Sequence, residues 1–160
     1  MNRNAGPEDE RRRSVPRDRR HRAREAALQI LYQWEVGRAD IEEVLRTYWT
    51  IERPGEPALS APLESFATKL AAGTVGHLDE IDPLIGASAE HWRLSRMAIV
   101  DRLILRLAVY EFLHSPDVPK KVVMNEALEL AKTFSSDEAV RFVNGILDGI
   151  KRGLETQERP

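Results

Sequence analysis

The chain lacks cysteine altogether, and this absence removes several classes of protein at once. Disulfide frameworks, thiolate metal sites and cysteine nucleophiles all require a sulfhydryl group, so none of them applies. No uninterrupted apolar stretch is long enough to span a bilayer. The positive charges near the N-terminus are not followed by the apolar stretch of a secretory signal. We therefore expect a cytoplasmic protein that does not interact with a membrane.

Common catalytic motifs are also missing. The sequence contains no GxSxG, P-loop, GxGxxG or HExxH pattern, which favours a non-enzymatic protein without a cofactor. His77, Asp79, Glu80 and Asp82 resemble a metal site, but on a helix only His77 and Glu80 share a face. A solvated acidic helix end is the simpler interpretation, and we expect no metal.

Charge is distributed unevenly along the chain, although the net charge is only −2. Residues 1–24 contain nine arginines and four acids, whereas residues 25–160 contain fifteen Lys and Arg against twenty-two Asp and Glu. A basic arm on an acidic body is typical of proteins that bind nucleic acid. The guanidinium group of arginine suits this task because its permanent charge and planar fork bind phosphate bidentately and stack on bases.

Three alternatives for this arm remain open. It is a solvated tail without a partner, a membrane-binding helix, or a nucleic-acid-binding segment. The arginine-rich part lacks the apolar face that a membrane helix needs. Composition does not distinguish RNA from DNA, but no helix-turn-helix, zinc-ligand set or heptad zipper accompanies the arm, and arginine-rich arms are common in RNA recognition. RNA is therefore weakly favoured.

Hydrophobic spacing predicts an all-α fold with about six helices and no strand. Residues 1–18 have almost no large apolar side chain and are expected to be disordered, as is a short tail at 155–160. The helical domain between them covers residues 19–154. Its expected helices span residues 19–37, 40–48, 60–85 with a break near Pro83, 94–113, 121–134 and 136–154.

Particular residues mark the helix ends. Gly37 fits the C′ position of the first helix, and Asp40 and Ser60 fit N-caps. Ser135 with Glu138 three positions later predicts a capping box. Residues 94–113 are apolar on most faces, which predicts a central, buried helix. In the last helix, Gly145 and Gly149 predict close packing against a neighbouring helix.

Several polar residues interrupt these apolar patterns. Buried charges are costly unless they are paired, so we expect Arg106 to form an internal ion pair with a carboxylate such as that of Glu126. Asp101 and Arg102 lie nearer the start of the central helix, where they can reach a protein partner. The turns before and after residues 121–134 extend the basic arm into a groove if they lie near the first helix. Their residues are Lys120, Lys121, Phe134, Ser135 and Ser136, and Arg141 and Phe142 lie one to two turns further along the last helix; for Phe142, core packing is the alternative role.

Four stretches form an ordered set: RHRAREAALQILY (residues 20–32), DRLILRLAVYE (101–111), VPKKVVMNEALELAKTF (118–134) and FVNGILD (142–148). Taken in this order, they resemble the transcription antitermination factor NusB family. Each stretch is weak alone, but their order and spacing over residues 19–152 make the set specific. The N-terminal extension is longer than the family's minimal pattern, His21 replaces a common arginine, and Ser135 replaces a common glycine.

The resemblance implies a fold, an RNA target and a set of partners. The implied fold is two small helical bundles that share a central helix. The implied function is binding to the single-stranded boxA element of ribosomal RNA leader transcripts, together with NusE, a small-subunit ribosomal protein. Other Nus factors and RNA polymerase would join indirectly. On the partner side, Asp101 is the best candidate, with Arg102 beside it. The implied RNA-side residues are Arg19, Arg20, His21, Arg22, Arg24, Tyr32, Lys120, Lys121, Phe134, Ser135, Ser136, Arg141 and Phe142.

Two other functions stay open at this point. NusB-like modules are also fused to the N-terminus of RNA cytosine methyltransferases, so the chain is alternatively an RNA-binding or interaction module of such a system. That enzyme needs a following Rossmann-like domain, which we do not expect in a chain that ends at Pro160. A protein-interaction bundle with an inert arm is the second alternative, and an RNA titration separates it from the leading hypothesis.

Overall fold

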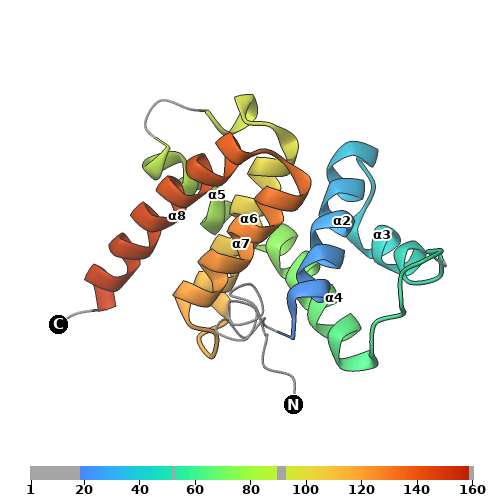
Figure 1. Ribbon diagram of the computed structural model, residues 1–160. Coiled ribbons are helices and arrows are strands. Elements are labelled where there is room, and N and C mark those ends of the chain that lie inside the picture. Colours follow the sequence, from blue (N-terminus) through green and yellow to red (C-terminus); the bar gives the residue numbers. More distant parts are fainter. Residues whose placement is uncertain (1–18, 52, 90–92, 159–160) are drawn as a thin grey trace, which may run out of the picture.

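The computed structural model describes residues 19–51, 53–89 and 93–158, and every regular element within them is helical (Figure 1). This confirms the predicted all-α fold, with seven α-helices rather than about six and one short 3₁₀ helix among the described residues. The bounds are α2 His21–Gly37, α3 Ile41–Tyr48, α4 Ala61–Gly76, α5 Leu78–Ser88, η1 Leu94–Arg96, α6 Ile99–His114, α7 Lys120–Phe134 and α8 Asp137–Glu158.

Helix α6 is the centre of the molecule, as its apolar pattern predicts. It packs against α2, α4, α5, α7 and α8. Figure 1 shows it between α2, α3 and α4 on one side and α5 and α8 on the other. Its residues Leu103, Ile104, Leu105 and Val109 are completely excluded from solvent. None of the described helices combines the length and apolar character needed to cross a membrane.

Two expected helices are each divided by a local change in the backbone. The break in the 60–85 segment falls at His77, not near Pro83, which lies inside α5. His77 leaves helical geometry (φ −125°, ψ 23°), and its N–H bonds to the Thr74 carbonyl in a tighter turn. In the 94–113 segment, Met97 and Ala98 are extended, so only residues from Ile99 onward form the central helix.

The helix ends correct several predictions. Gly37 is still helical, and the left-handed residue after α2 is Arg38 (φ 49°). Asp40 and Ser60 occupy the expected N-cap positions, but neither side chain makes a capping hydrogen bond. The cap of α8 is Ser136, not Ser135: the Ser136 hydroxyl accepts a hydrogen bond from the Ala139 N–H at 3.0 Å. Helix α7 begins at Lys120 rather than Lys121.

The C-terminal helix is longer and less tightly packed than expected. Helix α8 reaches Glu158, so residues 155–158 are helical rather than part of a tail, while residues 159–160, like 1–18, lie outside the described residues. A Cβ added to Gly145 would meet open space, and one added to Gly149 would only touch Ser88 at ordinary contact distance. The predicted close helix packing at these glycines is therefore wrong. It occurs instead at Gly73, where an added Cβ would lie 2.2 Å from the Tyr110 ring.

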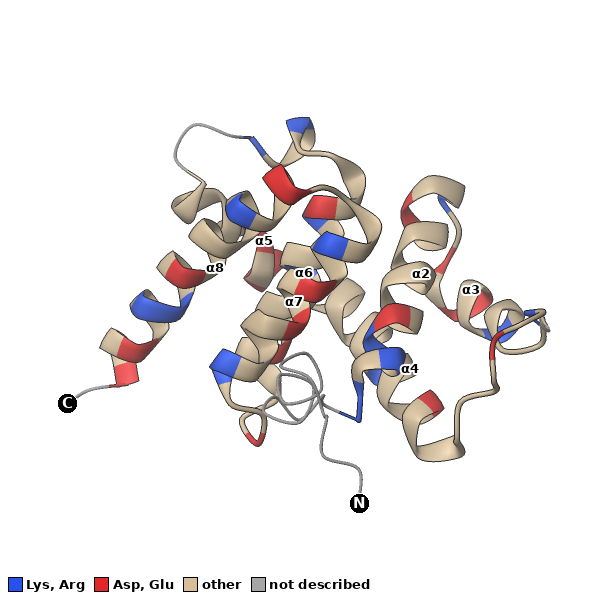
Figure 2. Cartoon of the chain, in the orientation of Figure 1, with Lys and Arg blue, Asp and Glu red and all other residues tan. Residues whose placement is uncertain are grey.

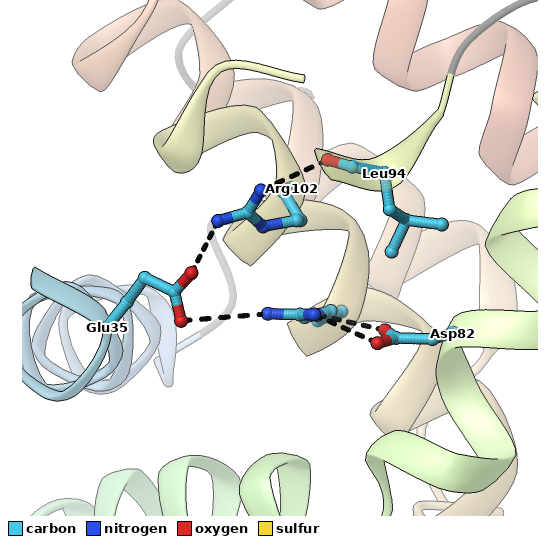
Figure 3. A network of polar contacts seen from close by, with 5 residues as sticks. Glu35, Asp82, Leu94 and Arg102 are labelled. Atoms are coloured by element: carbon cyan, nitrogen blue, oxygen red, sulfur yellow. Dashed lines mark hydrogen bonds and ion pairs between the residues drawn. The ribbon is translucent and has the colours of Figure 1, made fainter. Parts of the chain in front are cut away.

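A polar network joins α2 to α5 and α6 (Figure 3). Arg106 binds Asp82 through two hydrogen bonds of 2.9 Å and lies 4.0 Å from a Glu35 carboxylate oxygen. Arg102 donates to the other oxygen of Glu35 and to the Leu94 carbonyl. Arg106 thus forms the predicted internal ion pair, but its partner is Asp82 on α5 and not Glu126, which contacts His21 on α2.

Candidate nucleic-acid interface

The starts of α2 and α7 lie side by side, and we call the cationic surface that they form the basic end. Its residues are Arg19, Arg20, His21, Arg22, Lys120 and Lys121. Two contacts hold the two starts together: Arg20 lies 3.8 Å from Asp117, and His21 Nδ1 lies 2.6 Å from a Glu126 oxygen. Figure 2 shows Lys and Arg where α2 and α7 begin. The turn before α7 therefore does lie beside the first helix, as a shared RNA site requires.

The side chains of the basic end differ in how far they are available to a ligand. Arg19 and Lys121 are exposed, and Arg22 is exposed but donates a hydrogen bond to the Pro57 carbonyl. Arg20 is partly exposed and stacks on the Phe66 ring, with its guanidinium carbon 4.2 Å from the ring centroid. Lys120 lies 3.4 Å from Glu158. The first N–H groups of α7 add partial positive charge to this end, because the first turn of a helix leaves its donors without intrahelical acceptors.

Arg24 does not belong to this surface, although the sequence interpretation placed it there. Its side chain is only 1% exposed and forms two hydrogen bonds of 2.8 Å with the Glu111 carboxylate on α6. Glu111 is 2% exposed. The pair fixes α2 to the central helix, so the Arg24 guanidinium is not available to phosphate.

The remaining predicted RNA residues lie at the α7–α8 junction. Helix α7 has 15 residues and rises 1.5 Å per residue, so this junction lies roughly 20 Å from the basic end. Ser135 donates a hydrogen bond of 2.7 Å to Asp101, Ser136 caps α8, and Arg141 is exposed. Phe142 is partly buried against the core, which agrees with its alternative packing role. The structure thus divides the single predicted site into two patches.

Tyr32 and Phe134 meet beside this junction in a groove that the sequence did not reveal. The groove has a volume of about 360 Å³, and none of the described residues that line it is charged. Both rings are substantially exposed, at 44% and 37%. Asp101 follows directly after one of the lining residues, Val100. The full lining is Leu28, Gln29, Tyr32, Gln33, Val100 and Phe134.

A second hollow, of about 690 Å³, is lined in part by Arg22 and was also missed. Residues of α2, Tyr48 of α3, and residues 49–51 and 53–59 form most of its walls. The Tyr48 hydroxyl in this wall donates to Gln29 at 2.6 Å, and the Arg53 guanidinium covers the Tyr48 ring. Burial raises the pKa of Tyr48 above its ordinary value of 10.0, although the neighbouring Arg53 opposes the shift.

These features define a class of protein: an all-helical body built around one central helix, with a cationic end suited to a polyanion. The same body carries an uncharged groove suited to the surface of another protein. The chain belongs to the NusB family, whose family model matches residues 21–152. It is 44% identical over 140 residues to the transcription antitermination protein NusB of Koribacter versatilis, covering 88% of this chain and 93% of that protein. It is 45% identical over 139 residues to the NusB protein of Symbiobacterium thermophilum, covering 85% and 91%.

Solved structures agree with this assignment. T. maritima NusB superimposes with a TM-score of 0.74 at 35% sequence identity, covering 86% of this chain and 93% of that chain. A crystal structure of the antitermination factors NusB and NusE in complex with double-stranded RNA matches with a TM-score of 0.71 at 27% identity. That match covers 85% of this chain and 99% of the other. The fold implied by the resemblance is thereby confirmed.

Proposed function

We propose that this chain is a non-enzymatic RNA-binding transcription antitermination factor. It binds the single-stranded boxA element of ribosomal RNA leader transcripts together with NusE and supports processive transcription by RNA polymerase. The observation that carries the proposal is the basic end, where two helix starts distant in sequence form one cationic surface. The relatives named as transcription antitermination proteins support the antitermination role, and the similar structure that contains NusE and double-stranded RNA supports RNA and NusE as partners.

Charge favours the basic end as the place where RNA phosphates bind. Arg19, Arg22 and Lys121 are exposed there, and phosphate contacts supply most of the sequence-independent affinity for RNA. The α7–α8 junction is less favourable to phosphate because the exposed acids Asp137 and Glu138 precede Arg141. We assign the junction residues Phe134, Ser135 and Ser136 to contacts with unstacked bases, which carry sequence preference in single-stranded RNA.

The groove beside Asp101 is the proposed side for NusE. Its lining contains apolar and amide side chains but no cation, so it is better suited to a protein surface than to an RNA backbone. Tyr32 therefore moves from the RNA side to the partner side in this proposal. Arg102 is engaged by Glu35 and the Leu94 carbonyl, so Asp101 rather than Arg102 is the expected partner contact.

The salt dependence of RNA binding tests the role of the basic end. Replacing Arg19, Arg22 and Lys121 by Ala removes three cations and should weaken binding to every single-stranded RNA. It should also flatten the slope of log K against log salt by about 2, because each phosphate contact on a single strand contributes roughly 0.7. The matched control replaces three exposed arginines outside this surface by Ala: Arg38, Arg46 and Arg96. Equal slopes for the two triple variants would remove the basic end from the mechanism.

Sequence preference requires a separate experiment. Immobilised boxA RNA and a scrambled RNA of the same length and composition are each incubated with the chain, with and without NusE. We expect the boxA RNA to retain more protein, and NusE to increase that difference. Equal recovery on both RNAs would leave only binding by charge and would contradict the proposed boxA specificity.

A further inference from the structure

Three potential metal ligands converge where α4 gives way to α5 and where α6 ends. His77 lies at the α4–α5 break, Glu80 lies in the first turn of α5, and His114 is the last residue of α6. Each offers one ligand atom, and the three atoms lie within 4.8 Å of one another. The two imidazole rings are 4.2 Å apart between centroids, and His114 Nε2 lies 3.1 Å from a Glu80 carboxylate oxygen.

The surroundings of His77 fix which of its nitrogens is free to bind an ion. His77 Nδ1 lies 2.7 Å from the Gly73 carbonyl oxygen. Because a carbonyl only accepts hydrogen bonds, we assign the proton of the neutral ring to Nδ1, which leaves a lone pair on Nε2. Metal-binding histidines usually have this arrangement, with the second ring nitrogen held by a carbonyl or a carboxylate.

His114 supplies the second, independent observation. Its Nε2 atom is excluded from solvent, and among the described residues it has no hydrogen-bond partner of acceptable geometry despite the nearby Glu80 oxygen. A buried nitrogen without a partner is costly, and a cation between it and the carboxylate would satisfy both groups. Asp79 is not one of the three converging ligands, and Asp82 is bound to Arg106.

We propose that His77, Glu80 and His114 form a binding site for a divalent transition-metal ion, with Zn²⁺ the best match. Two imidazoles and one carboxylate are a ligand set that Zn²⁺ accepts, with a water in the fourth position. Metal–ligand distances of about 2.0–2.2 Å require the three ligand atoms to move closer than they lie now. Glu80 allows this movement because its side chain is 48% exposed. The bound ion ties the α4–α5 break to the end of α6. The proposal differs from the expectation, based on the sequence alone, that the chain binds no metal.

The test titrates the tag-free full-length chain with Zn²⁺ by calorimetry and with Co²⁺ by visible absorption. The variants are Glu80→Gln and His114→Asn. The matched control is Asp79→Asn, which removes the same charge from the same exposed turn. We expect one equivalent to bind to the wild type and to Asp79→Asn, and binding at least tenfold weaker in the other two variants, because even losses outside the ligand set weaken metal binding 10- to 100-fold.

Thermal unfolding provides a second measurement that does not depend on the binding isotherm. Zn²⁺ should raise the Tm of the wild type and of Asp79→Asn, and should raise that of Glu80→Gln less at the same Zn²⁺ concentration, because an ion that binds only the folded state stabilises it more when it binds more tightly. Circular dichroism without metal checks that each variant is folded, and Glu80→Gln is expected to fold because the side chain is half exposed. The proposal is overturned if the wild type takes up no ion, or if Glu80→Gln and Asp79→Asn bind it equally well.

Discussion

Replacing Arg24 by Met should unfold the protein at a much lower temperature without removing an RNA contact. The Arg24 and Glu111 side chains are 1% and 2% exposed, and two hydrogen bonds of 2.8 Å join them. The substitution leaves the Glu111 carboxylate buried without a counter-charge, which costs about 3–5 kcal/mol. A domain of this size loses roughly 3 °C in Tm for each kcal/mol, so we expect the Tm to fall by about 10–15 °C.

The assay is thermal and urea unfolding followed by circular dichroism, with RNA affinity measured well below the Tm. Arg22→Met is the matched control: it lies two positions earlier on α2, is exposed, and loses only an exposed hydrogen bond to the Pro57 carbonyl, so it should cost no more than about 1 kcal/mol while weakening RNA binding. Replacing Arg24 by Met together with Glu111 by Leu should restore much of the loss, because an apolar pair of similar volume leaves no buried charge. The reasoning is refuted if Arg24→Met alone is as stable as the wild type and binds RNA as poorly as Arg22→Met.

Three further predictions concern packing, capping and pH. Gly73→Ala should destabilise the protein, because the added Cβ would lie 2.2 Å from the Tyr110 ring. Gly145→Ala should stabilise it by about 0.5–1 kcal/mol, because glycine is unfavourable inside a helix and the added Cβ meets open space. The two substitutions should therefore shift the urea midpoint in opposite directions. Ser136→Ala should cost about 1 kcal/mol by removing the cap on the Ala139 N–H, and Ser135→Ala should cost less; equal losses would contradict the assignment of the cap. Burial holds the pKa of Tyr48 above 10.0, so the Tyr48 hydroxyl loses its proton at a lower pH in the unfolded chain than in the folded one. Stability should therefore fall as the pH rises from about 10 through the folded-state pKa. The urea midpoint should fall less steeply with pH for Tyr48→Phe than for the wild type, and an equal pH dependence in the two proteins would argue against the shift.

Local patterns predicted the helices well because the information lies within a few residues. The apolar run of the central helix and the N-cap positions of Asp40 and Ser60 depend on spacing along one segment. The predicted cap at Ser135 failed by a single residue. Both serines can cap a helix, but the Ser135 hydroxyl instead donates a hydrogen bond to Asp101, 34 residues away, and a partner so distant in sequence has no local signal.

Ion pairs were the least predictable part of the site because their partners are distant in sequence. Arg106 pairs with Asp82 across 24 residues, and Arg24 pairs with Glu111 across 87. The burial of Arg24 did leave a signal: it precedes Ala27, Leu28 and Leu31 at the three-, four- and seven-residue spacing of one helix face. A lone arginine on an apolar face indicates an internal partner, even when it belongs to an arginine-rich arm.

The hydrogen bond between Ser135 and Asp101 joins the two surfaces to which we assign different ligands. A protein group that replaces Ser135 at the Asp101 carboxylate, or a base that replaces Asp101 as the acceptor of the Ser135 hydroxyl, breaks this bond and frees the other residue. Thermodynamic reciprocity then requires that each ligand change the affinity of the other by the same factor. A single exposed hydrogen bond is thus a place where cooperativity between RNA and protein partner can be adjusted by substituting one hydroxyl group.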